Sequence, residues 1–331
     1  MSTEKGLENF SLSELLSELR ARDSQKSAAN KSTGPQEAVS GSASGAPAAN
    51  DMLAQADTGA IAMAVQGKQK VIYGVDDRKD VFELTVQQDK DDVESVAALF
   101  QDGDVTDNGD GTSTLRTQNF GTAKNLCQGE RFRDQPIGAF CSGFLVAPDI
   151  IATAGHCADT NDVTSIRFVF GFRMLNKTTA QTVINNSDIY SGVSIIGRQL
   201  TQSGTDWALV RIDRAITNRR VLPIRRTGKI ADDQRLHVIG HPTGLPTKFA
   251  GGASVRDNQP QAFFVANLDT YGGNSGSPVF NSDTHMVEGI LVRGETDFVS
   301  SGGCNISLVC PNTGCRGEDS TRTTEFEHLV P

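Results

Sequence analysis

The sequence predicts an all-β protein built from many short strands joined by turns. Its 331 residues include 33 Gly, while aromatic residues make up only 6%. From about residue 71 onward, short apolar or alternating runs are separated by Gly, Asn, Asp and Pro, and long helical periodicity is absent. Repeated short strands at this spacing are typical of a β-sandwich or β-barrel. The runs are AFCSGFLVA (139–147), SIRFVFG (165–171), DWALVRI (206–212), LHVIGH (236–241), QAFFVAN (261–267) and VEGILV (287–292).

Charge and hydropathy argue against two classes of protein. The chain has 31 basic and 40 acidic residues, a formal net charge of −9, whereas a nucleic-acid binder needs a basic face to meet phosphate. No stretch approaches the roughly 18 consecutive apolar residues of a membrane span. We therefore expect a soluble protein with no nucleic-acid partner and no membrane span.

The first 70 residues differ in texture from the rest. Residues 11–22 predict a short amphipathic helix, because Ser11 and Glu14 form a capping box and Leu residues recur at helical spacing. Residues 27–60 are rich in Ala, Ser, Gly, Pro, Thr and Asn. Such a segment lacks the apolar content to offset its ordering entropy, which predicts a flexible linker. The positive-then-apolar pattern of a secretory signal peptide is not visible.

The segment DGDVTDNGDGT (102–112) crowds four carboxylates, those of Asp102, Asp104, Asp107 and Asp110. It lacks the glycine and the closing Glu of an EF-hand at the required spacing. Asn-Gly and Asp-Gly pairs are ordinary hairpin turns. We therefore predict a turn here and no metal.

One of the five histidines stands out by its surroundings. His156 lies in TAGHC (153–157), directly after the apolar run FLVAPDIIA (144–152). Cys157 follows it, and Cys141 lies sixteen residues before Cys157 on the preceding strand. A bridge between these cysteines would pin the His-bearing loop and contribute about 3 kcal/mol. We interpret the other four as structural or solvent-exposed, namely His237, His241, His285 and His328.

Two further segments are weak signals when taken singly. Asp206 opens the run DWALVRI, where an Asp can simply end a hairpin. Ser275 lies in YGGNSGSPVF (271–280), among Gly272, Gly273 and Gly276. Glycines allow a tight backbone approach and positive φ, which suits an outward-facing nucleophile but equally a plain turn.

Taken together, these segments resemble the chymotrypsin-like (trypsin-fold) serine peptidases. TAGHC is followed by DWAL fifty residues later and by GNSGSP a further sixty-nine residues on, and the order His, Asp, Ser is that of this fold. VIGHPTGLPTKFA (238–250) and ANLDTYGGNSGSPVFN (266–281) are similar to the bacterial branch that contains the glutamyl endopeptidases. The resemblance covers about 71–295 and implies two antiparallel six-stranded β-barrels with the catalytic residues between them.

The resemblance also implies a role for each residue. Ser275 matches the nucleophile, His156 the general base and later acid, and Asp206 the residue that orients the imidazole, while the backbone N–H groups of Gly273 and Ser275 match the oxyanion hole. The implied reaction is hydrolysis of protein or peptide substrates through an acyl-enzyme, by a monomer that needs no cofactor and no metal. The alternative is a catalytically inactive homologue that binds peptides or a partner in the same cleft.

The specificity pocket of the family maps to 269–273 and 292–294. Asp269 stands where trypsins carry the Asp that receives Lys or Arg, which implies cleavage after basic residues; the alternative is that Asp269 caps a turn and points away. Thr270 matches a Thr of the glutamyl branch, but Leu291 replaces the pocket His of that branch. Arg293 is a cation that could still bind an acidic substrate side chain. The expected substrate-binding residues are Asp269, Thr270, Val292, Arg293 and Gly294.

The resemblance suggests three segments along the chain. Val71-Ile72 resembles the start of a mature bacterial peptidase, which makes 1–70 a propeptide released by cleavage after Lys70. The peptidase domain spans 71–303, with the barrels dividing near 220–232. Asn274 stands where animal trypsins carry an Asp that pairs with the freed α-ammonium group, so zymogen control must work differently.

The remaining segment, 304–331, is expected to be a tail packed on the barrels. It contains Cys304, Cys310 and Cys315, whose spacing suits zinc poorly. With Cys127 they allow three pairings, and we expect two disulfides that clamp the tail to the barrels. The even cysteine count and the fold predict a secreted or periplasmic protein.

Overall fold

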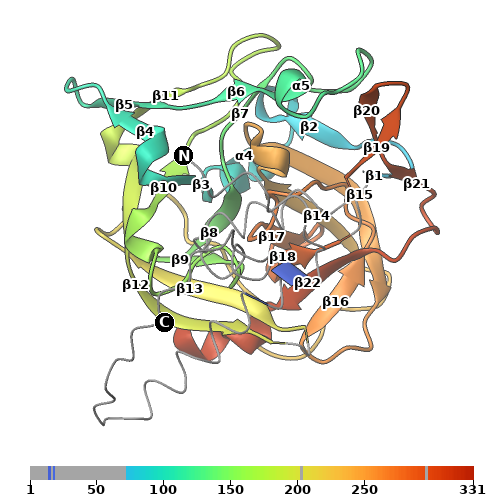
Figure 1. The fold of residues 1–331 in the computed structure, drawn as a ribbon. Helices are drawn as coiled ribbons and strands as arrows, with labels where there is room; N and C mark the ends of the chain where they lie inside the picture. Colours follow the sequence, from blue (N-terminus) through green and yellow to red (C-terminus); the bar gives the residue numbers. More distant parts are fainter. Residues whose placement is uncertain (1–13, 16–17, 19–71, 202–203, 295–296) are drawn as a thin grey trace, which may run out of the picture.

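The structure is a computed structural model that describes residues 14, 15, 18, 72–201, 204–294 and 297–331. Two closed barrels of six antiparallel strands make up its body, and they stand side by side in Figure 1, green to yellow and orange to red. The predicted all-β, two-barrel fold is confirmed. None of the described helices is long and apolar enough to cross a membrane.

The first barrel closes where its last strand returns to its first. Phe144, Leu145, Ile151 and Leu209 are fully buried members of the apolar cluster around its strands. In the order in which they neighbour one another, the strands are β3 (Val96–Gln101), β8 (Cys141–Ala147), β9 (Ile150–Thr153), β13 (Asp206–Ile212), β12 (Ile189–Leu200) and β10 (Ile166–Phe170).

The second barrel is closed by the pairing of β14 with β15. An additional short strand, β2 (Arg78–Asp80), lies against β15 on the outside of the ring. The buried ion pair of Asp80 with Lys248, 2.5 Å apart, fixes that strand. The six barrel strands are β14 (Arg235–Gly240), β17 (Pro278–Asn281), β18 (Val287–Arg293), β22 (Glu318–Arg322), β16 (Phe263–Ala266) and β15 (Lys248–Asp257).

The predicted boundary at 303 falls short of the end of this barrel. Strand β22 begins at Glu318 and pairs with both β16 and β18. The segment after 304 therefore contributes a strand to the barrel wall, in addition to loops on its surface. Between the two barrels, β13 ends at Ile212 and β14 begins at Arg235. The division near 220–232 stays a prediction.

Short elements decorate the barrels. The carboxylate-rich segment forms the turn between β4 and β5, where Asp107 and Asp110 accept backbone N–H groups within the turn, so the predicted turn is present. The other strands are β1 (Ile72–Tyr73), β4 (Val105–Asp107), β5 (Thr112–Leu115), β6 (Gln118–Asn119), β7 (Pro136–Ile137), β11 (Val183–Asn185), β19 (Phe298–Ser301), β20 (Cys304–Ser307) and β21 (Val309–Cys310).

The described helices are short. Two are α-helical, α4 (Gln87–Val93) and α5 (Phe120–Ala123). The last two turns carry Phe326 back to the first barrel, where its ring lies 5.5 Å from that of Trp207. The 3-10 turns are η2 (Val81–Glu83), η3 (Asp102–Asp104), η4 (Val163–Ser165), η5 (Asn186–Asp188), η6 (Pro242–Gly244), η7 (Thr323–Glu325) and η8 (Glu327–Leu329).

All six cysteines lie in the described part of the chain, and all are paired. Besides the bond of Cys141 with Cys157, the structure joins Cys127 to Cys304 and Cys310 to Cys315. The expectation that two disulfides clamp the tail is therefore wrong. Cys310 and Cys315 are five residues apart and close a small loop within the tail, so only Cys127–Cys304 links it to an earlier segment.

Most predictions on the first 70 residues lie outside the described residues. Of the helix expected over 11–22, the structure describes Glu14, Leu15 and Glu18, which are helical, and Leu15 is buried. The linker expected over 27–60 and the bond between Lys70 and Val71 are not among the described residues.

Candidate active site

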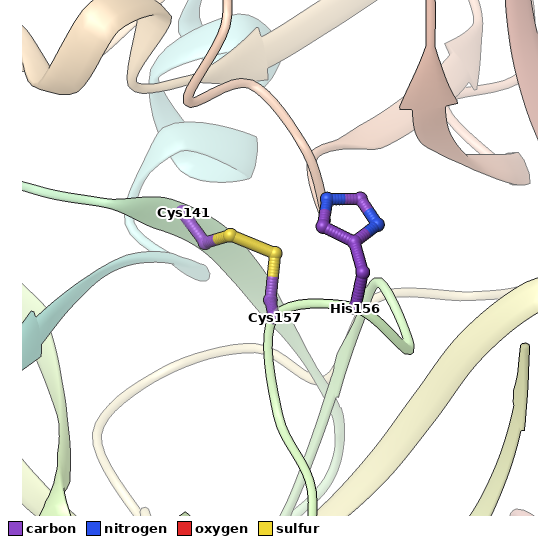
Figure 2. Close-up of side chains that lie close together, drawn as sticks. All are labelled: Cys141, His156 and Cys157. Atoms are coloured by element: carbon purple, nitrogen blue, oxygen red, sulfur yellow. A yellow bond between two sulfur atoms is a disulfide. The ribbon is translucent and has the colours of Figure 1, made fainter. Parts of the chain in front are cut away.

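His156 lies in the loop that follows β9, beside the disulfide of Cys141 with Cys157. Figure 2 shows its imidazole standing clear of the two sulfurs. The preceding Gly155 lets the loop pass close to the first barrel, because a Cβ at this position would lie 2.5 Å from the carbonyl oxygen of Gln199. Strand β8, the disulfide and Gly155 together hold the imidazole against the barrel.

Asp206, the first residue of β13, holds this imidazole at two points. Its Oδ2 lies 2.8 Å from His156 Nδ1, and its Oδ1 accepts the backbone N–H of His156 at 3.1 Å. Both side chains are buried. This arrangement fixes the ring orientation and leaves Nε2 as the nitrogen that can exchange a proton.

The electrostatics of Asp206 favour its charged form. Burial by itself raises the pKa of this carboxyl, but the charge of His156 and the hydrogen bonds from it outweigh burial, and the pKa lies below its usual value. Asp206 is thus an anion beside the ring, able to stabilise an imidazolium during proton transfer.

The loop carrying Ser275 is held on strand β8 of the other barrel. The backbone N–H of Ser142 donates to the Ser275 carbonyl at 2.8 Å, and Ser142 Oγ donates to the Gly273 carbonyl at 3.0 Å. Gly276 has a φ of +88°, and a Cβ there would lie 1.9 Å from the Ser142 carbonyl oxygen. A side chain at Gly276 would therefore push the Ser275 loop away from β8.

The loops of His156 and Ser275 are in contact, since Cys157 Sγ lies 3.8 Å from the carbonyl oxygen of Ser275. Ser275 Oγ and His156 Nε2 are both buried and have no hydrogen-bond partner among the described residues. Catalytic hydrogen bonds are often long or poorly aligned without substrate and tighten when it binds. The His156–Asp206 contact is therefore the half of the expected triad that the structure forms.

The backbone around Ser275 has the features expected of an oxyanion site. Gly273 adopts a φ of +90°, and the preceding N–H of Gly272 donates to the Asp297 carboxylate at 3.1–3.2 Å. Neither the Gly273 nor the Ser275 N–H donates to an acceptor within the described segments. Both N–H groups thus remain available to a developing oxyanion.

Asp269 does not occupy the place expected for a receptor of Lys or Arg. Its two carboxylate oxygens accept the backbone N–H groups of Tyr73, at 2.6 Å, and Asp77, at 2.8 Å. Burial raises the pKa of Asp269 to about 7, although these hydrogen bonds lower it. The carboxyl group therefore anchors the segment around β1, which favours the alternative that its side chain caps a turn.

A different carboxylate lies between the two expected pocket walls. Glu318, the first residue of β22, is fully buried, and its Oε2 accepts a hydrogen bond from Thr270 Oγ1 at 3.2 Å. A Cβ at Gly294 would lie 1.8 Å from the same oxygen, so a glycine is needed for the carboxylate to sit there. Glu318 was missed in the sequence because it belongs to the segment interpreted as a tail.

Two other expected pocket residues turn elsewhere. Val292 is buried in the apolar cluster shared by the barrels. Arg293 pairs with Asp319 at 3.3 Å and donates to the carbonyl of Gly204 at 2.6 Å. Because Asp319 offsets its charge, Arg293 is a weak candidate for receiving an acidic substrate side chain.

Comparison with known families decides the identity of the domain. A family model described as a trypsin-like peptidase domain matches residues 141–290, a range that contains His156, Asp206 and Ser275. Residues 141–290 are therefore similar to a trypsin-like peptidase domain. The predicted resemblance to the trypsin-like serine peptidases is thus confirmed, and no curated protein matches the chain at a significant level.

Solved structures similar to this peptidase domain are distant in sequence. A Glu endopeptidase in complex with MPD has 18% identity and a TM-score of 0.47 over 78% of this chain and 97% of that one. The Vibrio cholerae VesB protease has 15% identity and a TM-score of 0.46, over 79% and 67%. Human heparin binding protein has 15% identity and a TM-score of 0.47, over 78% and 95%.

Proposed function

We propose that this protein is a serine endopeptidase that cleaves after Lys or Arg. The observation that carries the catalytic part is the buried contact of His156 with Asp206, 2.8 Å apart, beside the loop that presents Ser275. A buried imidazole held by a carboxylate anion is what a serine nucleophile needs as its base.

The reaction takes place in two halves. His156 Nε2 accepts the Ser275 hydroxyl proton as Oγ attacks the scissile carbonyl carbon, and the N–H groups of Gly273 and Ser275 stabilise the resulting oxyanion. Collapse of this intermediate breaks the C–N bond, and His156 gives its proton to the leaving amine. A water molecule then attacks the acyl-enzyme by the same route, which releases the acid and restores Ser275.

The preference for a basic side chain rests on Glu318. This buried carboxylate lies against Thr270 and Gly294. Thr270 belongs to one expected wall of the pocket, and Gly294 belongs to the other. A buried carboxylate favours a cationic group that can form charge-assisted hydrogen bonds with it. The charge of Arg293 is offset by Asp319, so Arg293 is not used in this assignment.

A peptide-library profile tests both parts of the proposal. We expect hydrolysis after Lys and Arg, and its loss in Ser275→Ala. Glu318→Gln is expected to lower kcat/KM for basic substrates by at least about 100-fold, the scale of a lost charge-assisted contact, whereas the matched variant Asp269→Asn keeps the basic preference. Equal turnover of Lys and Glu substrates by wild type and by Glu318→Gln would contradict the assignment of Glu318.

The inactive-homologue alternative has a distinct signature in the same experiment. A protein that binds the library peptides in its cleft but hydrolyses none of them, with Ser275→Ala behaving like wild type, would be a binding module. Loss of the basic preference with hydrolysis intact would instead overturn only the role of Glu318.

We further propose that residues 1–70 are removed by cleavage after Lys70 and that the enzyme is secreted or periplasmic. Three disulfides support an oxidising compartment. Mass spectrometry of active material is expected to show a chain that begins at Val71. Full activity of a chain with residue 1 intact would contradict the processing step.

A further inference from the structure

A second group of potential ligands lies outside the peptidase site. We propose that Asp89, His237 and His285 bind one zinc ion. One ligand atom of each side chain lies within 4.8 Å of the other two. Asp89 belongs to α4, His237 to β14, and His285 to the turn between β17 and β18. The group therefore joins the helix that precedes the first barrel to one strand and one turn of the second.

His237 is the member that most needs a ligand to explain it. Its side chain is 2% exposed, its Nδ1 lies 3.1 Å from Ser282 Oγ, and its Nε2 has no hydrogen-bond partner among the described residues. The ring is stacked between Phe249 and Phe280, with centroids 4.9 and 4.7 Å away. A buried ring nitrogen without a partner is costly, and a metal ion would complete its coordination.

His285 is oriented as metal-bound histidines usually are. Its Nδ1 lies 2.6 Å from Oδ2 of the fully buried Asp92. A carboxylate that accepts the proton of one ring nitrogen fixes the tautomer and leaves the other nitrogen as a ligand. Asp92 lies one helical turn after Asp89 on α4, so the same helix supplies one carboxylate to orient His285 and one to bind the ion.

The spacing of the two rings fits a shared ion. The centroids of His237 and His285 are 5.4 Å apart, with planes inclined at 56°. Two imidazoles bound to one tetrahedral zinc at about 2.0–2.1 Å have centroids about 5 Å apart. Two nitrogens and one carboxylate oxygen are a donor set that suits zinc. Asp89 and His285 are only partly buried, which leaves room for water as the fourth ligand.

Zinc binding by the metal-stripped full chain tests the proposal. After treatment with EDTA and its removal, isothermal titration with Zn²⁺ is expected to show one tight equivalent, and Co²⁺ should give the visible absorption of a four-coordinate site. His285→Ala and Asp89→Asn are each expected to weaken zinc binding by at least about 100-fold, and Asp92→Asn by about 10–100-fold. The matched control is His328→Ala, an exposed histidine whose loss leaves binding unchanged.

His285 and Asp89 are both partly exposed, so their variants should fold. Each variant is compared with itself in EDTA and with added Zn²⁺, because His285→Ala also removes a partner of the buried Asp92 and lowers stability without zinc. Added Zn²⁺ is expected to raise only the melting temperatures of wild type and His328→Ala. The proposal is overturned if wild type binds no zinc, if His285→Ala binds it as tightly as wild type, or if binding disappears in His156→Ala alone, which would place the ion in the peptidase site.

Discussion

The described residues include two His–Asp pairs in which the carboxylate is fully buried, and the groups around the two pairs differ. In one, His156 Nδ1 lies 2.8 Å from Asp206; in the other, His285 Nδ1 lies 2.6 Å from Asp92. His156 stands beside the loop of a serine, whereas His285 stands beside a second histidine and another carboxylate.

This difference shows that a His–Asp pair alone does not define a catalytic site. In both pairs the carboxylate holds Nδ1 and leaves the second ring nitrogen for another task. The third group then decides the chemistry: Ser275 offers a proton to be removed, while His237 and Asp89 offer lone pairs that suit a metal ion. Exposure separates the pairs further, since the side chain of His156 is 1% exposed and that of His285 19%.

Exchange of each aspartate for asparagine tests this distinction with the largest expected effect. Asp206→Asn is expected to lower kcat/KM by about 10⁴-fold, because the amide no longer holds the imidazole in the tautomer that accepts the Ser275 proton. It should leave zinc affinity unchanged. Asp92→Asn should lower zinc affinity and change kcat/KM far less than Asp206→Asn does. Steady-state kinetics and zinc titration of both variants measure kcat/KM and zinc affinity. Equal losses of kcat/KM in the two variants would contradict the different roles assigned to the two pairs.

The glycine next to the nucleophile gives the second prediction. Gly276→Ala should lower kcat/KM by at least about 100-fold, because the methyl group collides with the Ser142 carbonyl and shifts the Ser275 loop away from the imidazole. Gly103→Ala is a suitable control, since no atom lies within 4 Å of a Cβ at that position. Zinc binding should be unaffected in both variants. Wild-type kinetics in Gly276→Ala would contradict the geometry assigned to this loop.

Removal of the disulfide next to His156 should have a smaller effect, mainly on stability. The Cys141→Ala/Cys157→Ala double variant is expected to lose about 3 kcal/mol of unfolding free energy, since its bridge closes a loop of sixteen residues. Its kcat/KM should also fall, because the His156 loop is no longer pinned to β8. The zinc titration, in contrast, should not change. Urea unfolding measures this loss. An unchanged free energy of unfolding would show that the disulfide does not stabilise the His156 loop.

The smallest expected effect concerns a carboxyl group that has no histidine partner. Burial raises the pKa of Asp269 to about 7, in contrast to the lowered pKa of Asp206. Between pH 4 and 7 the folded protein therefore keeps a proton on Asp269 that the unfolded chain has lost. Because of this proton, the free energy of unfolding falls as pH rises, by at most about 1.4 kcal/mol per pH unit. Urea unfolding at pH 5 and pH 7.5 should show a smaller change in unfolding free energy for Asp269→Asn than for wild type. An equal change in the two proteins would contradict the raised pKa of Asp269.

Local motifs allowed the fold class to be predicted from the sequence and candidate catalytic residues to be named. TAGHC, DWAL and GNSGSP each carry their chemistry within a few neighbouring residues, and short strands separated by turn residues indicate barrels. The position of Glu318 between the expected pocket walls could not be predicted from local motifs. Glu318 meets Thr270 across 48 residues, and only the pairing of β22 with its neighbours brings it there.

Side-chain direction was the other limit. Asp269 was expected to line the specificity pocket, but one of its carboxylate oxygens accepts the backbone N–H of Tyr73, 196 residues away. His237 and His285 were interpreted as structural because neither stands in a motif; their proximity depends on the pairing of β14 with β17 and on the position of α4. Contacts between distant segments thus account for what the sequence did not predict.

The central claim is that Ser275 is a nucleophile activated by His156. Labelling with a fluorophosphonate probe tests it most directly, because the probe reacts with an activated serine whatever the specificity of the pocket. The account predicts that processed wild-type protein is labelled on Ser275, that labelling disappears in Ser275→Ala and His156→Ala, and that it persists in Glu318→Gln and His285→Ala. No labelling of processed wild type, or equal labelling of Ser275→Ala, would contradict it.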